Sequence, residues 1–312
     1  MGNRIFVAIV ILLWLITMSW LFVAKILPPL DQGLPPTYRG LRAGTEACWK
    51  IHWNDEHVGW AVNRVEDGSG GTKEIHSRVL LREMRLSDLA PSFLASLVKN
   101  VGDVSLDAKS RIELDPLGNL SGFETTLNVN DVPAIRMRGR VEGSELRLFI
   151  RAGELTREEH RYFPQDARLG SELAPDGRLP GMYVGRRWKM QVFSPFPSPA
   201  DPVELIEGEV VAEEMIQYGR GTETVRRIEF RRLSSAGIAS GNEVRATLWV
   251  KEDGTVVRQD VNVLSAKVRF ERVEGPAAQR RVERMLSPWR NRFRPPAEKS
   301  SGEPVEILPA DV

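Results

Sequence analysis

The strongest constraint on the fold is a two-residue alternation of apolar and polar side chains between residues 46 and 274. It is clearest in LWVKEDGTVVRQDVNVL, residues 248–264. The turn Glu252-Asp253-Gly254-Thr255 separates two alternating segments, and Asp-Gly supplies the positive backbone angles of a tight hairpin. Because strand side chains alternate between faces, the pattern predicts an antiparallel hairpin with one apolar face: Val244, Ala246, Leu248 and Val250, then Val257, Gln259, Val261 and Val263.

The same pattern recurs upstream and predicts roughly ten to twelve mostly antiparallel strands joined by short turns. Two segments break it. Residues 86–101 have apolar side chains at helical spacing, which predicts one amphipathic helix. This helix would be either a lid on a half-barrel or a helix packed on one sheet face. Residues 161–182 are rich in proline and glycine and predict a long loop.

The amino terminus predicts a membrane span. Residues 5–24 carry no charge, and about 20 apolar residues suffice to cross a bilayer. We expect a stub at 1–4, a transmembrane signal anchor at 5–26 and a proline-rich spacer at 27–45. The span would include Ile5, Trp14, Trp20 and Ala24, with Trp20 near its outer end. The alternatives are a cleaved signal peptide, for which the apolar run is too long, and a buried core helix.

The amino-acid composition limits the partners and binding sites to be expected. The chain has 43 basic and 42 acidic residues, and this balance argues against a nucleic-acid partner. Its single cysteine, Cys48, excludes an intrachain disulfide, and four scattered histidines are few for a metal framework. We expect no cofactor. His52 and His57 flank a predicted turn, and this spacing favours a solvated loop over a weak metal site.

Three segments occur together in an order that resembles a known group of proteins: WKIHWNDEHVGWA (49–61), LPGMYVGRRWKMQVFSPF (179–196) and LWVKEDGTVVRQ (248–259). This order is similar to that of membrane-anchored bacterial β domains of unknown function, including domains that precede transglutaminase-like modules. Those domains are similar to the lipoprotein-carrier (LolA/LolB-like) fold. The resemblance implies a mainly β fold: a long curled antiparallel sheet, or incompletely closed barrel, with one or two helices.

The transglutaminase comparison raises one catalytic candidate. Cys48-Trp49 resembles the cysteine-tryptophan pair of that active site. A catalytic cysteine needs a histidine and an aspartate further along and activation at a helix start. Cys48 instead begins a strand, and His160 lies in a charged segment. A buried structural cysteine is therefore favoured, and we expect no enzyme activity.

Two basic segments are candidate contact surfaces. Arg136, Arg138 and Arg140 alternate along one predicted strand, as either an ordinary wet face or a docking strip for an anionic partner. In the tail (275–312), apolar residues of 277–293 follow helical spacing, although Pro288 weakens a continuous helix. This helix would lie on a membrane, pack on the domain or bind a partner, and disorder is expected from residue 295. Its candidate contact residues are Arg280, Arg281, Arg284, Trp289 and Arg290.

These features predict a non-enzymatic protein anchored in the inner membrane by a single pass, with most of the chain on the periplasmic side. Its β domain (46–274) would bind a lipid or other apolar ligand on the concave face of the sheet. The alternative is an accessory module with a solid core and no ligand, which contacts another envelope protein.

Overall fold

The computed structural model describes residues 2–21, 42–85, 103–130, 132–164, 167–169, 177–193, 203–233, 239–263 and 266–290. Two α-helices occur in this part of the chain, α1 (Gly2–Leu21) and α4 (Pro276–Arg290), with one short 3-10 turn, η3 (Ser69–Gly71). The first eight strands are β1 (Glu46–Trp53), β2 (Glu56–Asp67), β3 (Lys73–Arg85), β4 (Asp103–Leu114), β5 (Leu120–Val129), β6 (Val132–Glu142), β7 (Glu145–Ala152) and β8 (Leu155–Tyr162). The rest are β9 (Arg168–Leu169), β10 (Arg187–Phe193), β11 (Val203–Tyr218), β12 (Gly221–Leu233), β13 (Ala239–Val250), β14 (Val256–Val263) and β15 (Ala266–Val273).

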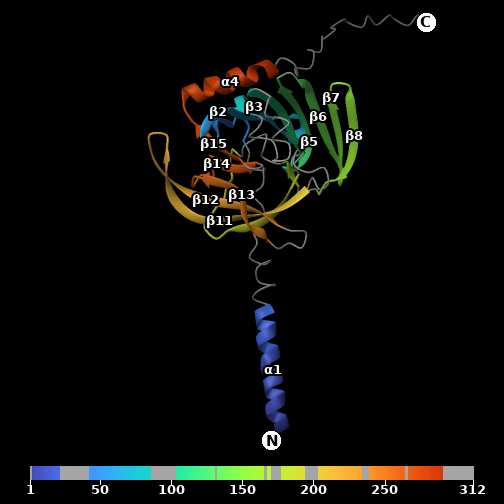
Figure 1. The fold of residues 1–312 in the computed structure, drawn as a ribbon, viewed down its shortest axis with the longest axis vertical. Helices are drawn as coiled ribbons and strands as arrows, with labels where there is room; N and C mark the ends of the chain where they lie inside the picture. The colour runs from blue at the N-terminus through green and yellow to red at the C-terminus, as the bar shows by residue number, and fades with distance from the viewer. Residues whose placement is uncertain are drawn as a thin grey trace, which may run out of the picture.

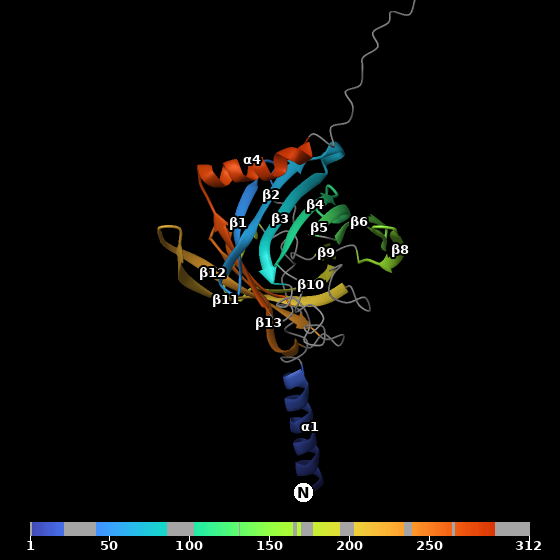
Figure 2. The same cartoon turned by 45° about the horizontal axis from the view of Figure 1, so that its top comes forward.

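All fifteen strands of the described residues belong to one sheet, in the order β8-β7-β6-β5-β4-β3-β2-β1-β15-β14-β13-β12-β11-β10-β9. Chain neighbours pair along each half, and β1 pairs antiparallel with β15 to join the halves. Every pairing is antiparallel except β9 with β10. The sheet curls without closing, as Figures 1 and 2 show. The predicted mainly β, curled antiparallel fold is confirmed, with more strands than the sequence indicated.

The inner face of the curled sheet is filled by its own side chains. Trp49, Trp188 and Phe193 are almost fully buried in one apolar cluster that draws on both halves of the sheet. Phe163, just after β8, makes an edge-on contact with Phe193 of β10, with ring centroids 5.8 Å apart. This contact joins residues near the two opposite ends of the sheet. Buried aromatic groups of this size supply much of a core's hydrophobic stabilisation.

One glycine shows how closely this core is packed. A Cβ atom on Gly208 of β11 would lie 2.5 Å from the indole ring of Trp188. The indole therefore occupies the space that any other residue at position 208 would fill. Interiors packed at this density tolerate changes in volume poorly.

The hairpins form at turns whose residues accept positive φ angles. Asn54 and Asp55 connect β1 to β2 with positive φ angles of 48° and 70°, which suit a two-residue hairpin. Gly254, in the predicted turn between β13 and β14, has φ +86°. The predicted face of Val257 is wrong, because a register shift between Trp249 and Val250 moves Val257 out of the inner cluster. A bulge adds one residue to a strand and so reverses the alternation locally.

The outer face is charged and internally paired over much of its area. Arg111 of β4 binds both carboxylate oxygens of Glu74 on β3, at 2.7 and 3.0 Å. The three arginines at alternate positions of β6 are exposed. Of these, Arg138 has a guanidinium nitrogen 3.4 Å from a carboxylate oxygen of Glu124.

The amino-terminal helix α1 stands apart from the sheet (Figure 1). It contains Ile5 and Trp14, and its described side chains are exposed, Trp14 by 57% and Trp20 by 67%. Among the residues that the structure describes, no helix meets the length and apolar character that a membrane crossing requires.

Several predicted segments lie outside the described residues: Ala24, most of the spacer, the helix at 86–101 and the tail from 291. Part of the predicted loop at 161–182 is described. Its residues 177–182 run beside the turn between β13 and β14. There the amide of Leu179 donates to the carbonyl oxygen of Gly254 at 2.7 Å.

Candidate ligand pocket beneath helix α4

Helix α4 lies across the outer face of β1, β2 and β3 (Figure 2). Its apolar side chains recur at the spacing that places them on one helix face. This face is buried against Cys48 of β1 and Val62 of β2, with Trp60 and Leu80 partly buried beside them. The buried helix residues are Ala278, Val282, Met285 and Leu286. The predicted helix therefore packs on the domain.

The helix continues through Pro288 to Arg290. Proline has no amide hydrogen and leaves the carbonyl four residues earlier without its helical donor. Here that carbonyl belongs to Arg284, and the hydroxyl of Ser287 donates to it at 3.3 Å. This local replacement explains why the predicted weakening at Pro288 does not end the helix.

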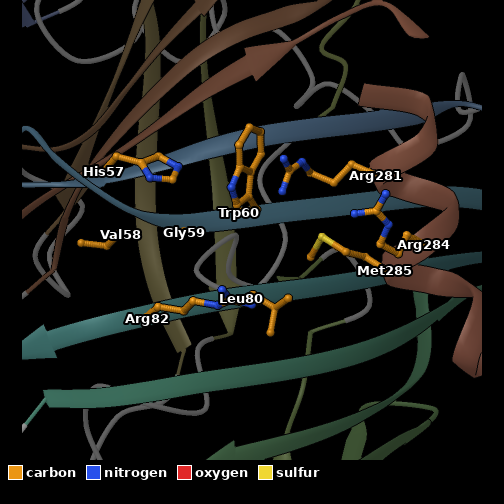
Figure 3. Close-up of a pocket in the computed structure, with 9 residues that line it drawn as sticks. All are labelled: His57, Val58, Gly59, Trp60, Leu80, Arg82, Arg281, Arg284 and Met285. Carbon is orange, nitrogen blue, oxygen red and sulfur yellow. The ribbon is translucent and has the colours of Figure 1, made fainter. Parts of the chain in front are cut away.

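A cavity of about 370 Å³ opens between α4 and the sheet (Figure 3). Strands β2 and β3 form one wall, and α4 forms the other. The volume lies at the small end of the range for ligand pockets, about 300–1,000 Å³. The lining residues are His57, Val58, Gly59, Trp60, Leu80, Arg82, Arg281, Arg284 and Met285.

Three guanidinium groups give the pocket a positive rim: Arg82 from β3 and Arg281 and Arg284 from α4. Within the described residues none of the three forms a salt bridge. The guanidinium carbon of Arg281 lies 3.4 Å from the centre of the Trp60 ring, which it covers (Figure 3). Such stacking is a favourable cation–π contact and holds the guanidinium in place.

Further positive groups surround the ring of Trp60. The ammonium of Lys50 lies 6.0 Å from its centroid. The His57 ring contacts two other rings edge-on. Its centroid lies 5.5 Å from that of Trp60 and 5.7 Å from that of His52. Burial lowers the pKa of His57, and the charges of His52, Lys50 and Arg281 lower it further. A histidine in this environment loses its proton readily, as expected where nearby charges are positive.

The two histidines flank the exposed turn Asn54-Asp55 between β1 and β2. They face each other across β1 and β2 at the end of the hairpin. Among the described residues, no group of three or more candidate ligands is placed to hold a metal ion.

Cys48 lies in the layer covered by α4 and is 2% exposed. Burial raises the pKa of its thiol to about 11, although Arg281 and Arg272 act in the opposite direction. The thiolate is the nucleophile in cysteine chemistry, and this thiol is protonated at neutral pH. The residues lining the pocket include no carboxylate, hydroxyl or thiol. The pocket is therefore equipped for binding an anion and an apolar group.

The basic tail residues separate into three groups. Arg281 and Arg284 line the pocket, whereas Arg280 is exposed and lies outside it. Trp289 and Arg290 belong to α4, but their side chains lie outside the described residues. Nothing in the sequence marks Trp60 and Arg82 as pocket residues. Their place in the alternation predicts only a sheet face, and only the packing of α4 makes that face one wall of a cavity.

No family model matches the chain, and no curated protein matches it. Its sheet has distant likenesses among solved structures. A beta-barrel-like protein of domain of unknown function DUF1849 from Brucella abortus is 10% identical, with TM-score 0.46, and the match covers 77% of this chain and 97% of that chain. A DUF1089 family protein from Pseudomonas aeruginosa is 15% identical, with TM-score 0.34, covering 68% of this chain and 93% of that one.

A putative exported protein with a YmcC-like fold from Bacteroides fragilis is 10% identical, with TM-score 0.24, and the match covers 77% of this chain and 96% of that chain. All three likenesses lie below a TM-score of 0.5. The fold described above rests on the strand pairing itself.

Proposed function

We propose that the protein is a non-enzymatic binding protein of the bacterial envelope, held at the inner membrane by its amino-terminal segment. Its β domain binds a lipid or other amphiphilic ligand in the pocket beneath α4. The observation that supports this proposal is the cavity of about 370 Å³ with an apolar wall and three guanidinium groups that form no salt bridge within the described residues.

The site differs from the concave face expected from the resemblance to lipoprotein carriers. In the described residues that face is filled by large side chains, among them Trp49, Trp188 and Phe193. The pocket on the outer face is lined by residues of β2, β3 and α4. The resemblance still supports the class of ligand, since the carrier fold is one that binds acyl chains.

Membrane attachment is proposed from the first 24 residues. Residues 5–24 carry no charge, and the described side chains of α1 between Val10 and Trp20 are largely exposed and apolar. Large exposed apolar surfaces mark sites of contact with a membrane or a partner. The proline-rich segment that follows would space the β domain, on the extracytoplasmic side, away from the bilayer.

The second candidate is an accessory module that contacts another envelope protein. The densely filled inner face favours it, because a solid sheet needs no ligand to complete its core. In this case the partner would present acidic side chains to the arginines of α4.

The test is native mass spectrometry of the full chain, purified in a mild detergent from bacterial membranes, followed by lipid extraction. A co-purifying ligand of fixed mass is expected. Leu80→Trp, which fills the pocket, should remove it, whereas Met215→Trp on exposed β11 should retain it. A ligand-free chain that carries a protein of fixed mass would favour the accessory module.

A further inference from the structure

The lining of the pocket beneath α4 has an excess of positive charge, because it includes three arginines and no acidic residue. On the sheet, Arg78 and Arg111 are bound by Asp107 and Glu74, respectively. In the pocket, the three arginines form no salt bridge among the described residues. At this end of the hairpin, Glu271 of β15 lies 3.5 Å from His52. Asp55 of the turn pairs with Arg269 at 2.8 Å, and Glu56 is exposed.

The remaining charges around the pocket do not cancel this excess. Lys50, His52 and His57 lie on the β1–β2 hairpin beside it. Glu283, an acidic residue of α4, is exposed and does not line the cavity. Asp107 already accepts two hydrogen bonds from Arg78.

The arginines are suited to a group with several acceptor oxygens. A guanidinium presents a planar fork of donors that matches the oxygens of phosphate or carboxylate in pairs. Three such forks line the cavity, Arg82 from the sheet and Arg281 and Arg284 from α4 (Figure 3). A phosphoryl group offers three or more oxygens, and a carboxylate offers two. Arg281 is already held over Trp60, which reduces the entropy lost on binding.

The same cavity has an apolar side. Leu80 and Met285 line it beside the Trp60 ring. These groups would remove an apolar substituent from water, at about 25 cal/mol per Å² of apolar surface buried. The small volume suits a head group with a short apolar portion.

We propose that this pocket recognises a phosphate ester that carries an apolar group, with Arg82, Arg281 and Arg284 binding the phosphoryl oxygens. The inference rests on the proposed binding function and names the chemistry of its ligand. The phosphate ester can come from a lipid head group at the membrane surface or from a soluble metabolite, because both present the same group.

The test uses the full chain in phosphatidylcholine nanodiscs and isothermal titration calorimetry with three probes. Hexyl phosphate should bind at least about tenfold more tightly than neutral hexyl glucoside, and more tightly than inorganic phosphate. Arg284→Gln should weaken hexyl phosphate binding about tenfold, the loss expected for one charge-assisted hydrogen bond. Arg280→Gln is the matched control from the same helix, and its affinity should be unchanged.

Equal binding of hexyl phosphate and hexyl glucoside, with no effect of Arg284→Gln, would overturn the phosphate assignment and leave the proposed binding function intact. Failure of all three probes to bind would count against both the phosphate assignment and the proposed binding function. Melting temperatures verify folding, and Arg82→Gln replaces any α4 variant that unfolds, because Arg82 is an exposed residue of the sheet. Weaker hexyl phosphate binding in nanodiscs containing phosphatidylglycerol would support a lipid source, and unchanged binding would support a soluble one.

Discussion

The guanidinium of Arg78 on β3 donates a hydrogen bond of 2.9 Å to the main-chain carbonyl of Met285 in α4. Its other nitrogens donate to both carboxylate oxygens of Asp107, at 2.8 and 2.9 Å. One side chain thus joins the sheet to the helix that covers it, and Asp107 fixes its orientation.

Replacing Arg78 should therefore loosen α4. Arg78→Met leaves the Met285 carbonyl without this donor and the carboxylate of Asp107 with only Lys109 nearby. We expect the free energy of unfolding to fall by about 1–3 kcal/mol, measured by urea denaturation. Arg138→Met is the control, because Arg138 is exposed and its ion pair should contribute less than about 1 kcal/mol. Equal losses in the two variants would show that Arg78 does not fasten the helix.

Gly254 should resist substitution. Its φ is +86°, and a Cβ atom there would lie 2.8 Å from the carbonyl oxygen of Leu179. Gly254→Ala should lower the unfolding free energy by about 2–4 kcal/mol, more than backbone conformation alone would cost. Gly219→Ala isolates that conformational cost, about 1 kcal/mol, since Gly219 has φ +62° and open space around it. A Gly254→Ala loss no larger than that of Gly219→Ala would contradict the close packing of Leu179 on this turn.

The thiol of Cys48 should make stability fall at high pH. Burial raises its pKa from an ordinary value of 9.0 to about 11. The folded state therefore holds the thiol proton more tightly than the unfolded state does. The resulting stabilisation is complete below pH 9 and is lost as pH rises from 9 through about 11. Unfolding free energies measured across pH 8–11.5 should decline more steeply for the natural protein than for Cys48→Ala, and parallel curves would refute the assignment.

His76 should make stability fall at low pH. Burial lowers its pKa below the ordinary 6.5, outweighing the raising effects of Glu66 and Glu74. The unfolded state therefore binds a proton more readily, and the stabilisation present above pH 6.5 is lost as pH falls through the folded-state pKa. Between pH 7 and 5, His76→Gln should lose less unfolding free energy than the natural protein. A steeper decline in the variant would mean that protonated His76 is stabilised by its two carboxylate neighbours.

The fold follows from local patterns to a large extent. Alternation and turn residues such as Asp253-Gly254 predict hairpins because both depend on neighbours in the chain. The pairing of β1 with β15 depends on contacts between residues more than 200 positions apart, such as Ile51 with Phe270, and no local pattern specifies it. The bulge at Trp249 likewise escapes prediction, because a single extra residue reverses the face of Val257.

The sequence indicates the basic residues on the helix side of the pocket but not the residues on its sheet side. Arg281 and Arg284 stand out because basic residues line one side of an amphipathic helix. Trp60 and Arg82 do not, because each occupies an ordinary position on the polar face of a strand. A cavity between two elements requires the position of both, and the position of α4 follows from the pairing of β1 with β15.

The pairing of β1 with β15 also determines when the pocket can form. Its sheet wall comes from residues 57–82 and its helix wall from residues 281–285. During synthesis the first wall emerges some two hundred residues before the second. A chain cut short just before α4 would therefore have the sheet wall but no pocket. The ligand binding proposed above would, in consequence, require that synthesis and folding of the whole domain are finished.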